Sequence, residues 1–345
     1  MIRVSQRARL TIFAMVAFVV VAGMTAYVVA SATRYQRAHD RPPTVATVAD
    51  TAAAVAVTTG PRIVFRHTGD DDHLGHVAVV PLADPGGPRA FTDVECDRVD
   101  ATAEVASCLR TERGVITKFS LTEYDADWHQ VDKVSLPGIP SRTRLSPDGS
   151  LVSSTTFVSG HSYMQVGFST VTEIRDVGGE NHGNLEKFDL VIHGDHVKPR
   201  DRNIWGVTFA DDNTFYATVG TGGETYLVRG DLAARSLTSV ADHVECPSLS
   251  PDGTRIGFKQ ATQRDGQTWW TPAVLDLATG ERTVLAGEQH NVDDQVAWLD
   301  DDTLLYGLAR DRQVGVTDVW ALGTSADARP QLFIQQAWSP AVVRP

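Results

Sequence analysis

Hydrophobic positions divide the chain into one N-terminal apolar segment and a long region of short alternating segments. Residues 10–32 contain no charged side chain and are rich in Val, Ala, Phe and Met. At about 1.5 Å rise per residue, a helix of this length crosses a hydrocarbon core of roughly 30 Å. From residue 62 onward, apolar or alternating stretches of four to eight residues are separated by Gly, Asp, Asn and Pro. This pattern predicts one membrane helix followed by an all-β domain.

The β region contains an internal repeat. The segment Leu145-Ser146-Pro147-Asp148-Gly149-Ser150 recurs as Leu249-Ser250-Pro251-Asp252-Gly253-Thr254, and two degenerate copies surround Asp212 and Asp301. In such a turn between two strands, Asp accepts hydrogen bonds from the turn backbone and Gly takes a positive φ. We therefore assign a structural role in turns to Asp148, Gly149, Asp212, Asp252, Gly253 and Asp301.

The spacing of this repeat predicts a β-propeller. Asp148, Asp212, Asp252 and Asp301 are separated by roughly 50 residues on average, a period typical of propeller blades with four short strands. Residues 61–345 hold six units of about this length. The segment Ala337-Trp338-Ser339-Pro340 echoes the repeat without a complete blade after it. We predict a six-bladed propeller whose last strand completes the blade that begins near Ile63.

The repeated units resemble the WD40-like PD40 repeats of the TolB β-propeller family. The resemblance covers residues 61–345, with two good and two degenerate repeats. Further segments are similar to a membrane-anchored TolB-like group from high-GC actinobacteria: Pro140-Ser141-Arg142, Gly160-His161-Ser162-Tyr163, Trp205-Gly206-Val207-Thr208-Phe209, Glu245-Cys246-Pro247-Ser248 and Asp293-Asp294-Gln295-Val296. The resemblance implies a six-bladed fold and a role in binding partners in the cell envelope. TolB proteins are soluble and carry a separate α/β domain, whereas an apolar segment and a linker precede the repeats here.

Residues around the apolar segment bear on its orientation. Three arginines precede it and three follow it within nine residues, so the positive-inside count is nearly even: Arg3, Arg7, Arg9, Arg34, Arg37 and Arg41. The very short N-terminal tail favours a signal anchor with its N-terminus inside and the bulk of the chain exported. Ala30-Ser31-Ala32 also fits a cleavage site, which leaves a cleaved signal peptide as the alternative.

These features give a division of the chain into four parts. We predict a cytoplasmic tail at residues 1–9, a transmembrane anchor at 10–32, a flexible linker at 33–60 and an extracytoplasmic propeller at 61–345. The linker assignment rests on Pro42-Pro43 and on a stretch of Ala, Thr and Val without a clear period.

Charge and cysteine content limit the classes of partner and the cellular compartment that we expect for this protein. The formal net charge is −12, and no cluster of Lys and Arg follows residue 41, which argues against a nucleic-acid partner. Cys96 and Cys108 are close in sequence and are candidates for a disulfide in an exported domain, with two buried thiols as the alternative. We expect Cys246 to be a buried thiol in a strand.

The candidate site lies at one mouth of the central channel, where the residues that begin each innermost strand converge. Its members are Arg142, Trp205, Glu245, Asp293, Asp294 and Gln295. Convergent polar groups around a concavity indicate a binding site. The alternative is that these residues pair with one another and fix blade to blade, with Arg142 against the carboxylates.

No motif for a catalytic reaction or a cofactor stands out. The sequence has no phosphate-binding loop that opens a helix and no Gly-x-Ser-x-Gly motif. Glu245, Asp293 and Asp294 are candidate calcium ligands without a calcium-binding motif, so no cofactor is assigned. We expect a binding module for an envelope protein, peptide or carbohydrate. The alternatives are a hydrolase or lyase, metal-assisted or not, at the same mouth, and a purely structural role.

Overall fold

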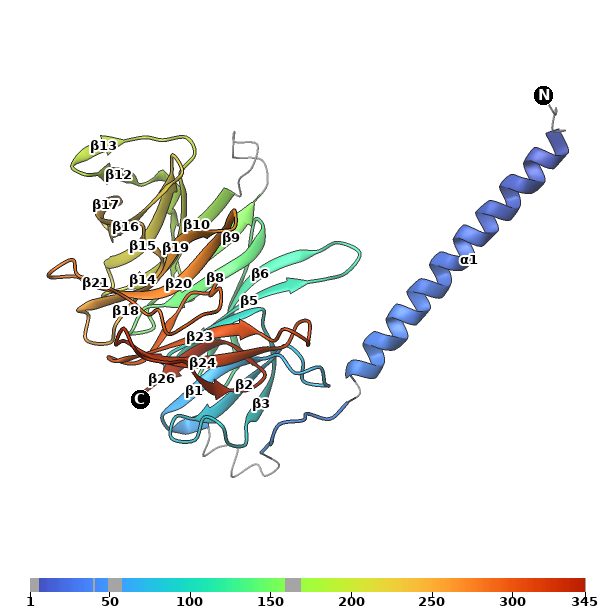
Figure 1. Cartoon of the computed structure of the whole chain (residues 1–345), viewed down its shortest axis with the longest axis horizontal. Helices are drawn as coiled ribbons and strands as arrows, with labels where there is room; N and C mark the ends of the chain where they lie inside the picture. Colours follow the sequence, from blue (N-terminus) through green and yellow to red (C-terminus); the bar gives the residue numbers. More distant parts are fainter. Residues whose placement is uncertain (1–5, 40, 49–57, 159–168, 345) are drawn as a thin grey trace.

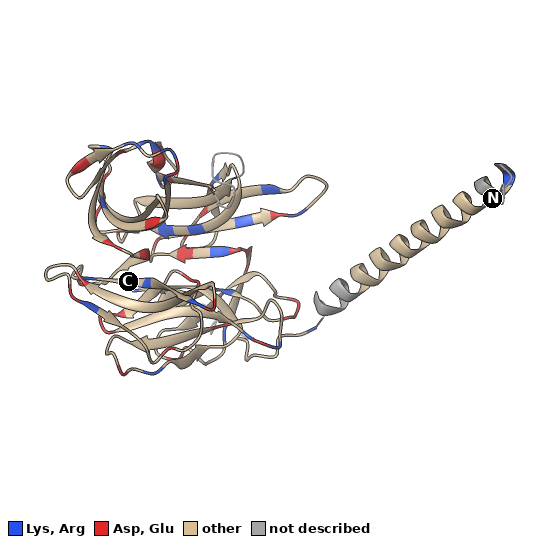
Figure 2. Cartoon of the chain, turned by 45° about the horizontal axis from the view of Figure 1, so that its top comes forward, with Lys and Arg blue, Asp and Glu red and all other residues tan. Residues whose placement is uncertain are grey.

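The computed structural model describes residues 6–39, 41–48, 58–158 and 169–344 (Figure 1). Much of the predicted tail, residues 49–57 of the predicted linker, and residues 160–163 lie outside the described residues. The helix α1 (Gln6–His39) contains the uncharged stretch Leu10–Thr33. Figure 2 shows no charged residue along this middle part of α1. Its length and composition suit a membrane span, and a signal sequence meets the same criteria.

Six sheets, antiparallel except for one outer strand pair in the fourth, form a six-bladed β-propeller, which confirms the fold predicted from the repeat. From the channel outward, the first blade contains β26 (Ala337–Val343), β1 (Arg62–His67), β2 (His76–Pro81) and β3 (Ala90–Glu95). The second blade contains β4 (Arg98–Ala101), β5 (Val105–Glu112), β6 (Lys118–Asp125) and β7 (Gln130–Ser135). The third blade contains β8 (Ile139–Leu145), β9 (Leu151–Val158), β10 (Ser169–Asp176) and β11 (Asn181–Asn184).

The remaining three blades follow the same order, and the fourth carries two extra strands. The fourth blade contains β14 (Asn203–Phe209), β15 (Thr214–Thr221), β16 (Glu224–Asp231) and β17 (Ser236–Asp242), extended by β12 (Asp189–Ile192) and β13 (Asp195–Val197). The fifth blade contains β18 (Glu245–Leu249), β19 (Arg255–Arg264), β20 (Gln267–Asp276) and β21 (Arg282–Val284). The sixth blade contains β22 (Ala297–Asp300), β23 (Thr303–Ala309), β24 (Thr317–Gly323) and β25 (Gln331–Ile334). A short 3₁₀ helix, η1 (Leu185–Lys187), precedes β12.

Apolar runs explain which strands lie in the core. The second strand of the first blade reads Ile63-Val64-Phe65, and all three side chains are at most 1 % exposed. A run of this kind, rather than strict alternation, is expected for a strand covered by neighbouring blades on both faces. The sheets therefore pack face to face around the ring and expose mainly their turns.

The ring closes by pairing the C-terminal strand with the N-terminal one. β26 runs antiparallel to β1, with Ile63 opposite Val342 and Val64 opposite Ala341. The first blade thus takes its innermost strand from the end of the chain and its other three strands from the beginning of the propeller. This pairing confirms the closure predicted from the incomplete final repeat.

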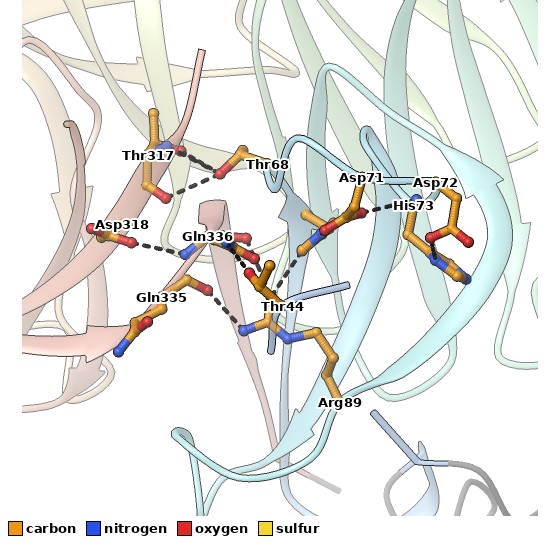
Figure 3. A network of polar contacts seen from close by, with 11 residues as sticks. Thr44, Thr68, Asp71, Asp72, His73, Arg89, Thr317, Asp318, Gln335 and Gln336 are labelled. Atoms are coloured by element: carbon orange, nitrogen blue, oxygen red, sulfur yellow. Dashed lines mark hydrogen bonds and ion pairs between the residues drawn. The ribbon is translucent and has the colours of Figure 1, made fainter. Parts of the chain in front are cut away.

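Buried polar contacts reinforce the closure (Figure 3). Arg89 is 3 % exposed and donates hydrogen bonds to the carbonyl oxygens of Gln335 at 2.8 Å and Gln336 at 3.2 Å, just before β26. Arg89 Nη1 also donates to His67 Nδ1 at 2.9 Å. Because a guanidinium only donates, His67 must be neutral with its proton on Nε2, which bonds Asp71 at 2.9 Å. Burial lowers the pKa of His67 and favours the same neutral form.

Part of the segment between α1 and the propeller is attached to the first blade. Val48 N donates to Arg89 O at 2.9 Å, and Asp72 N donates to Arg41 O at 2.9 Å. Figure 1 shows this segment, residues 41–48, running along the first blade after α1. The chain therefore meets the propeller two residues after the helix ends.

A disulfide joins the first two blades. Cys96 follows β3, Cys108 lies in β5, and their Cα atoms are 5.4 Å apart in the bonded pair. Cys246, in β18, is free and buried.

We predict that exported protein, denatured without reductant, takes up one thiol label, on Cys246. After reduction it should take up three. Intact-mass measurement after alkylation distinguishes these states, and labels on Cys96 and Cys108 in unreduced protein would refute the bridge. Replacing both cysteines by serine should lower the free energy of unfolding by about 3 kcal/mol.

We also predict that Gly307→Ala weakens the closed ring. A Cβ at Gly307, in β23, would lie 2.1 Å from Trp338 Cε3 of the closing strand β26. Relief of this overlap should cost roughly 1–3 kcal/mol of unfolding free energy in chemical denaturation. Gly86→Ala is the matched control, because nothing lies within 4 Å of its added Cβ. Equal midpoints for the two variants would contradict this account of the closure.

Candidate functional site

Irregular strand pairing shapes the mouth of the channel. The pairing register shifts near the start of the innermost strands β8, β14 and β18. Gly206 and Cys246 lie within the shifts of β14 and β18 and have φ angles of +67° and +51°. A Cβ on Gly206 would lie 2.7 Å from Cys246 Cα, so this close approach requires glycine. Because bulges re-aim side chains, they place Arg142, Trp205 and Glu245 at the mouth.

A cavity of about 260 Å³ opens at this mouth. Five successive blades contribute to it, and its wall consists of Arg98, Ser141, Arg142, Phe157, Trp205, Glu245, Cys246, Lys259, Trp270 and Asp293. Four of the six predicted site residues, Arg142, Trp205, Glu245 and Asp293, therefore come together. The wall is amphipathic, since it combines three cations and two carboxylates with three aromatic rings.

Two wall residues from the fifth blade, Lys259 and Trp270, organise the carboxylates. Lys259 is 5 % exposed, forms an ion pair with Asp293, and lies 4.4 Å from the ring centre of Trp270. Trp270 Nε1 donates a hydrogen bond to Glu245 at 3.2 Å. Burial raises the pKa of Glu245, and the positive charge of Lys259 opposes that rise only in part.

Arg142 is the cation of this wall that forms no ion pair with a described carboxylate, although burial alone would lower its pKa and neighbouring groups that include Asp294 and Asp293 raise it. Arg98 pairs with Asp294 and Lys259 with Asp293, whereas no described carboxylate oxygen lies within 4.0 Å of the Arg142 guanidinium. Its Nη1 donates to the adjacent Ser141 carbonyl at 3.0 Å, and its Nε is buried without a hydrogen-bond partner. Arg142 therefore places at the cavity wall a positive charge that has no ion-pair partner among the described carboxylates.

The other two predicted residues, Asp294 and Gln295, fix blades to one another instead of lining the cavity. Asp294 is 2 % exposed and accepts from Arg98 Nη1 at 2.9 Å and from Gly307 N at 3.2 Å. Gln295 Nε2 donates to the carbonyl oxygen of Pro247 at 2.9 Å. The adjacent space inside the channel measures only about 20 Å³, room for about one water molecule.

The structure shows no ion pair between Arg142 and the carboxylates, which was the alternative to a binding site. Arg98 and Lys259 take that role, and sequence reasoning missed both, together with Trp270 and Phe157. Arg98 belongs to the second blade, which lacks the repeated turn motif. Lys259 lies opposite Glu245 in the strand pairing, so a blade-by-blade alignment of second strands could have identified it.

The carboxylates considered as calcium ligands have protein cations beside them. Arg98 contacts Asp294 and Lys259 contacts Asp293. Within the described parts of the chain, three acidic or histidine side chains come within 4.8 Å of one another only at Asp71, Asp72 and His73, in the turn after β1. Glu245, Asp293 and Asp294 do not form such a group.

The residues of the repeated turns lie at the opposite face, around a hollow of about 790 Å³. Asp148 accepts from Ser150 N at 3.1 Å, and Asp252 accepts from Thr254 N at 3.0 Å. The following glycine has a positive φ in both turns, as expected for this turn geometry.

The two degenerate turns use a different aspartate from the one that the alignment suggested. Asp211 accepts from Asn213 N at 2.9 Å, one residue before Asp212. Likewise Asp300 accepts from Asp302 N at 3.0 Å, one residue before Asp301. Asp301 itself accepts from Asp252 N at 3.0 Å and links the fifth blade to the sixth.

No protein-family model and no curated protein matches this sequence. In structure, the chain is similar to TolB from Acinetobacter baumannii, with a TM-score of 0.56 and 16 % identity over 82 % of this chain and 67 % of that one. It is also similar to a TolB candidate from Agrobacterium tumefaciens, with a TM-score of 0.51 and 9 % identity over 82 % of this chain and 92 % of that one. A chain of the nidogen/laminin complex is similar with a TM-score of 0.54 and 13 % identity, over 82 % of this chain and 98 % of that one. At these identities the likeness establishes a TolB-like propeller fold and nothing about function.

We predict that Asp294→Ala destabilises the propeller. Arg98 would be left buried without its partner, and burial already lowers the pKa of Arg98 to about 10. Breaking such a pair costs about 3–5 kcal/mol, measurable by chemical denaturation. Asp212→Ala, at an exposed turn, is the control and should change stability by less than about 0.5 kcal/mol. If both variants unfold at the wild-type midpoint, Asp294 does not fix the blades.

Proposed function

We propose that this chain is a membrane-anchored, extracytoplasmic binding module that recognises an acidic group on an envelope protein, peptide or carbohydrate. The observation that carries the proposal is Arg142, a cation without a carboxylate partner in the wall of the mouth cavity. Arg142 is part-buried, and a part-buried charge without an ion-pair partner favours a site where a ligand supplies the counter-charge.

The chemistry of the cavity favours a ligand with both acidic and apolar character. An arginine recognises a carboxylate or phosphate through paired hydrogen bonds. Trp205 and Trp270 offer aromatic faces for an apolar side chain or a sugar ring. Glu245 and Asp293 can accept hydrogen bonds from ligand N–H or O–H groups. At about 260 Å³, the cavity admits a side chain, a chain end or a single sugar and not a folded domain.

The anchored location is supported by two features of the N-terminal part. α1 contains an uncharged stretch long enough to span a bilayer. The segment after it is bonded to the first blade through Arg41 and Val48. An anchor followed by so short a connection would hold the propeller close to the membrane surface.

Acidic ligands and their esters provide a direct test. Trp205 and Trp270 line the cavity, so occupancy should change tryptophan fluorescence. We expect at least one member of a panel of glutamate-containing peptides and uronic acids to bind the full chain saturably. Its methyl ester should bind at least tenfold more weakly, because a hydrogen bond to a charged group contributes about 1.5–3 kcal/mol.

The variant Arg142→Gln should reduce affinity for the acid by a similar factor and leave binding of the ester unchanged. Arg329→Gln is the matched control, because Arg329 is exposed and far along the chain from any residue of the cavity wall. Equal affinity of wild type and Arg142→Gln for every acid that binds would contradict the proposal, as would the absence of binding by all acids.

A further inference from the structure

The most exposed large apolar side chains of the described propeller lie at turns of one kind. Val115 is 108 % exposed, Val314 103 % and Ile116 76 %. Val115 and Ile116 lie between β5 and β6, and Val314 lies between β23 and β24. Both turns join the second and third strands of a blade. In antiparallel blades these turns lie on the same face as the beginnings of the innermost strands, which is the face with the mouth cavity.

The hairpin of β5 and β6 combines an apolar tip with basic flanks. Its tip reads Arg113-Gly114-Val115-Ile116-Thr117-Lys118. Arg113 and Lys118 are exposed, and no described carboxylate oxygen lies within 4.0 Å of either. Two unpaired cations on either side of two exposed apolar residues contrast with a chain whose formal net charge is −12. This arrangement suits an interface between water and an anionic lipid surface.

The hairpin is long enough to reach well beyond the ring. The first residue of β4, Arg98, pairs with Leu109, so residues 110–115 of the hairpin extend past the innermost strand of their blade. Six extended residues span about 20 Å. Figure 1 shows the β5–β6 hairpin projecting outward from its blade.

The attachment of the segment after α1 places this face near the membrane. Arg41, two residues after the end of α1, bonds to Asp72 and forms an ion pair with Asp70 at 3.4 Å. Both aspartates belong to the turn between β1 and β2, again a turn between second and third strands. Two residues span at most about 7 Å, and the six residues from Thr33 to His39 add about 9 Å of helix. The mouth face is therefore within roughly 15 Å of the apolar part of α1, less than the reach of the hairpin.

We infer that the tip of the β5–β6 hairpin docks into the interfacial region of the membrane that holds α1. Val115 and Ile116 enter the apolar boundary, while Arg113 and Lys118 contact the phosphates of anionic headgroups. The mouth cavity then faces the lipid surface, and its ligand is presented from that surface. The inference rests on the anchored location in the proposed function.

The test uses the full chain with Cys246→Ala, reconstituted through α1 into vesicles of phosphatidylcholine and phosphatidylglycerol. An environment-sensitive fluorophore is attached at Val115→Cys or, as the matched control, at Asp212→Cys on the opposite face. We expect a lipid-borne nitroxide to quench the probe at position 115 at least threefold more than the probe at 212. Pure phosphatidylcholine, or Arg113→Gln with Lys118→Gln, should reduce the quenching at 115. Equal quenching at 115 and 212 would overturn the inference.

Further measurements separate this inference from the proposed function. A probe at Val314→Cys reports on the same face without altering the hairpin, and it should also be quenched more than the probe at 212. If neither position is quenched while Arg142-dependent acid binding persists, docking is wrong and the binding function stands. If intact mass shows that membrane-bound native protein lacks α1, docking and anchoring both fail, and acid binding by the released propeller is then tested separately.

Discussion

Pairing between β26 and β1 is the constraint on which the rest of the structure depends. The six blades enclose a common channel only when the last strand joins the first blade. Arg89, which directly precedes the outer strand β3 of the first blade, strengthens this junction because it donates hydrogen bonds to the two carbonyl oxygens that precede β26. Gln336 of the same junction donates to Thr44 at 2.8 Å, so the segment after α1 is attached where the ring closes. Ring closure and attachment of the segment after α1 are thus one connected set of contacts (Figure 3).

The mouth combines residues with two different roles. Asp294 and Gln295 are buried and use their hydrogen bonds to hold separate blades together. Arg142 is adjacent to this framework, yet no described carboxylate pairs with it. A rigid set of bonds beside a cation without an ion-pair partner is the arrangement expected of a preorganised binding site, since little ordering is needed when a ligand arrives. The space beside this cavity inside the channel measures only about 20 Å³, which is too small for a ligand that enters at the mouth to continue through it.

The sequence allowed the prediction of features that a local motif repeats. The Ser-Pro-Asp-Gly turns marked the blades, and the incomplete unit around Trp338 marked the closure. The positions of Arg142, Trp205 and Glu245 relative to those turns also identified them as residues of the channel mouth, because each innermost strand begins there. In the degenerate turns the same alignment was displaced by one residue, since consecutive aspartates left the register open.

Features that depend on tertiary contacts could not be predicted from the sequence. Lys259 and Trp270 lie on long second and third strands, whose length the turn motif does not encode. The parallel pairing of β12 with β17 depends on burial of Leu190 and Leu237 in one core cluster, a contact between distant segments. The charge pairing at the mouth could not be assigned, because Arg98 comes from a blade without the motif. Attachment of residues 41–48 combines backbone hydrogen bonds with side-chain contacts of Arg41 and Thr44 to distant residues, Asp70 and Gln336, and no local pattern in the sequence marks these contacts.

The stability of Arg142→Met relative to wild type tests the central claim most directly and requires no knowledge of the ligand. If Arg142 is kept for binding, removing this part-buried charge, which forms no ion pair, should leave the free energy of unfolding unchanged or raise it by up to about 2 kcal/mol. Arg98→Met should lower it in the same experiment, because Asp294 would lose its partner. A loss of more than about 1 kcal/mol in Arg142→Met would show that Arg142 serves the fold, and would contradict its assignment as a recognition residue.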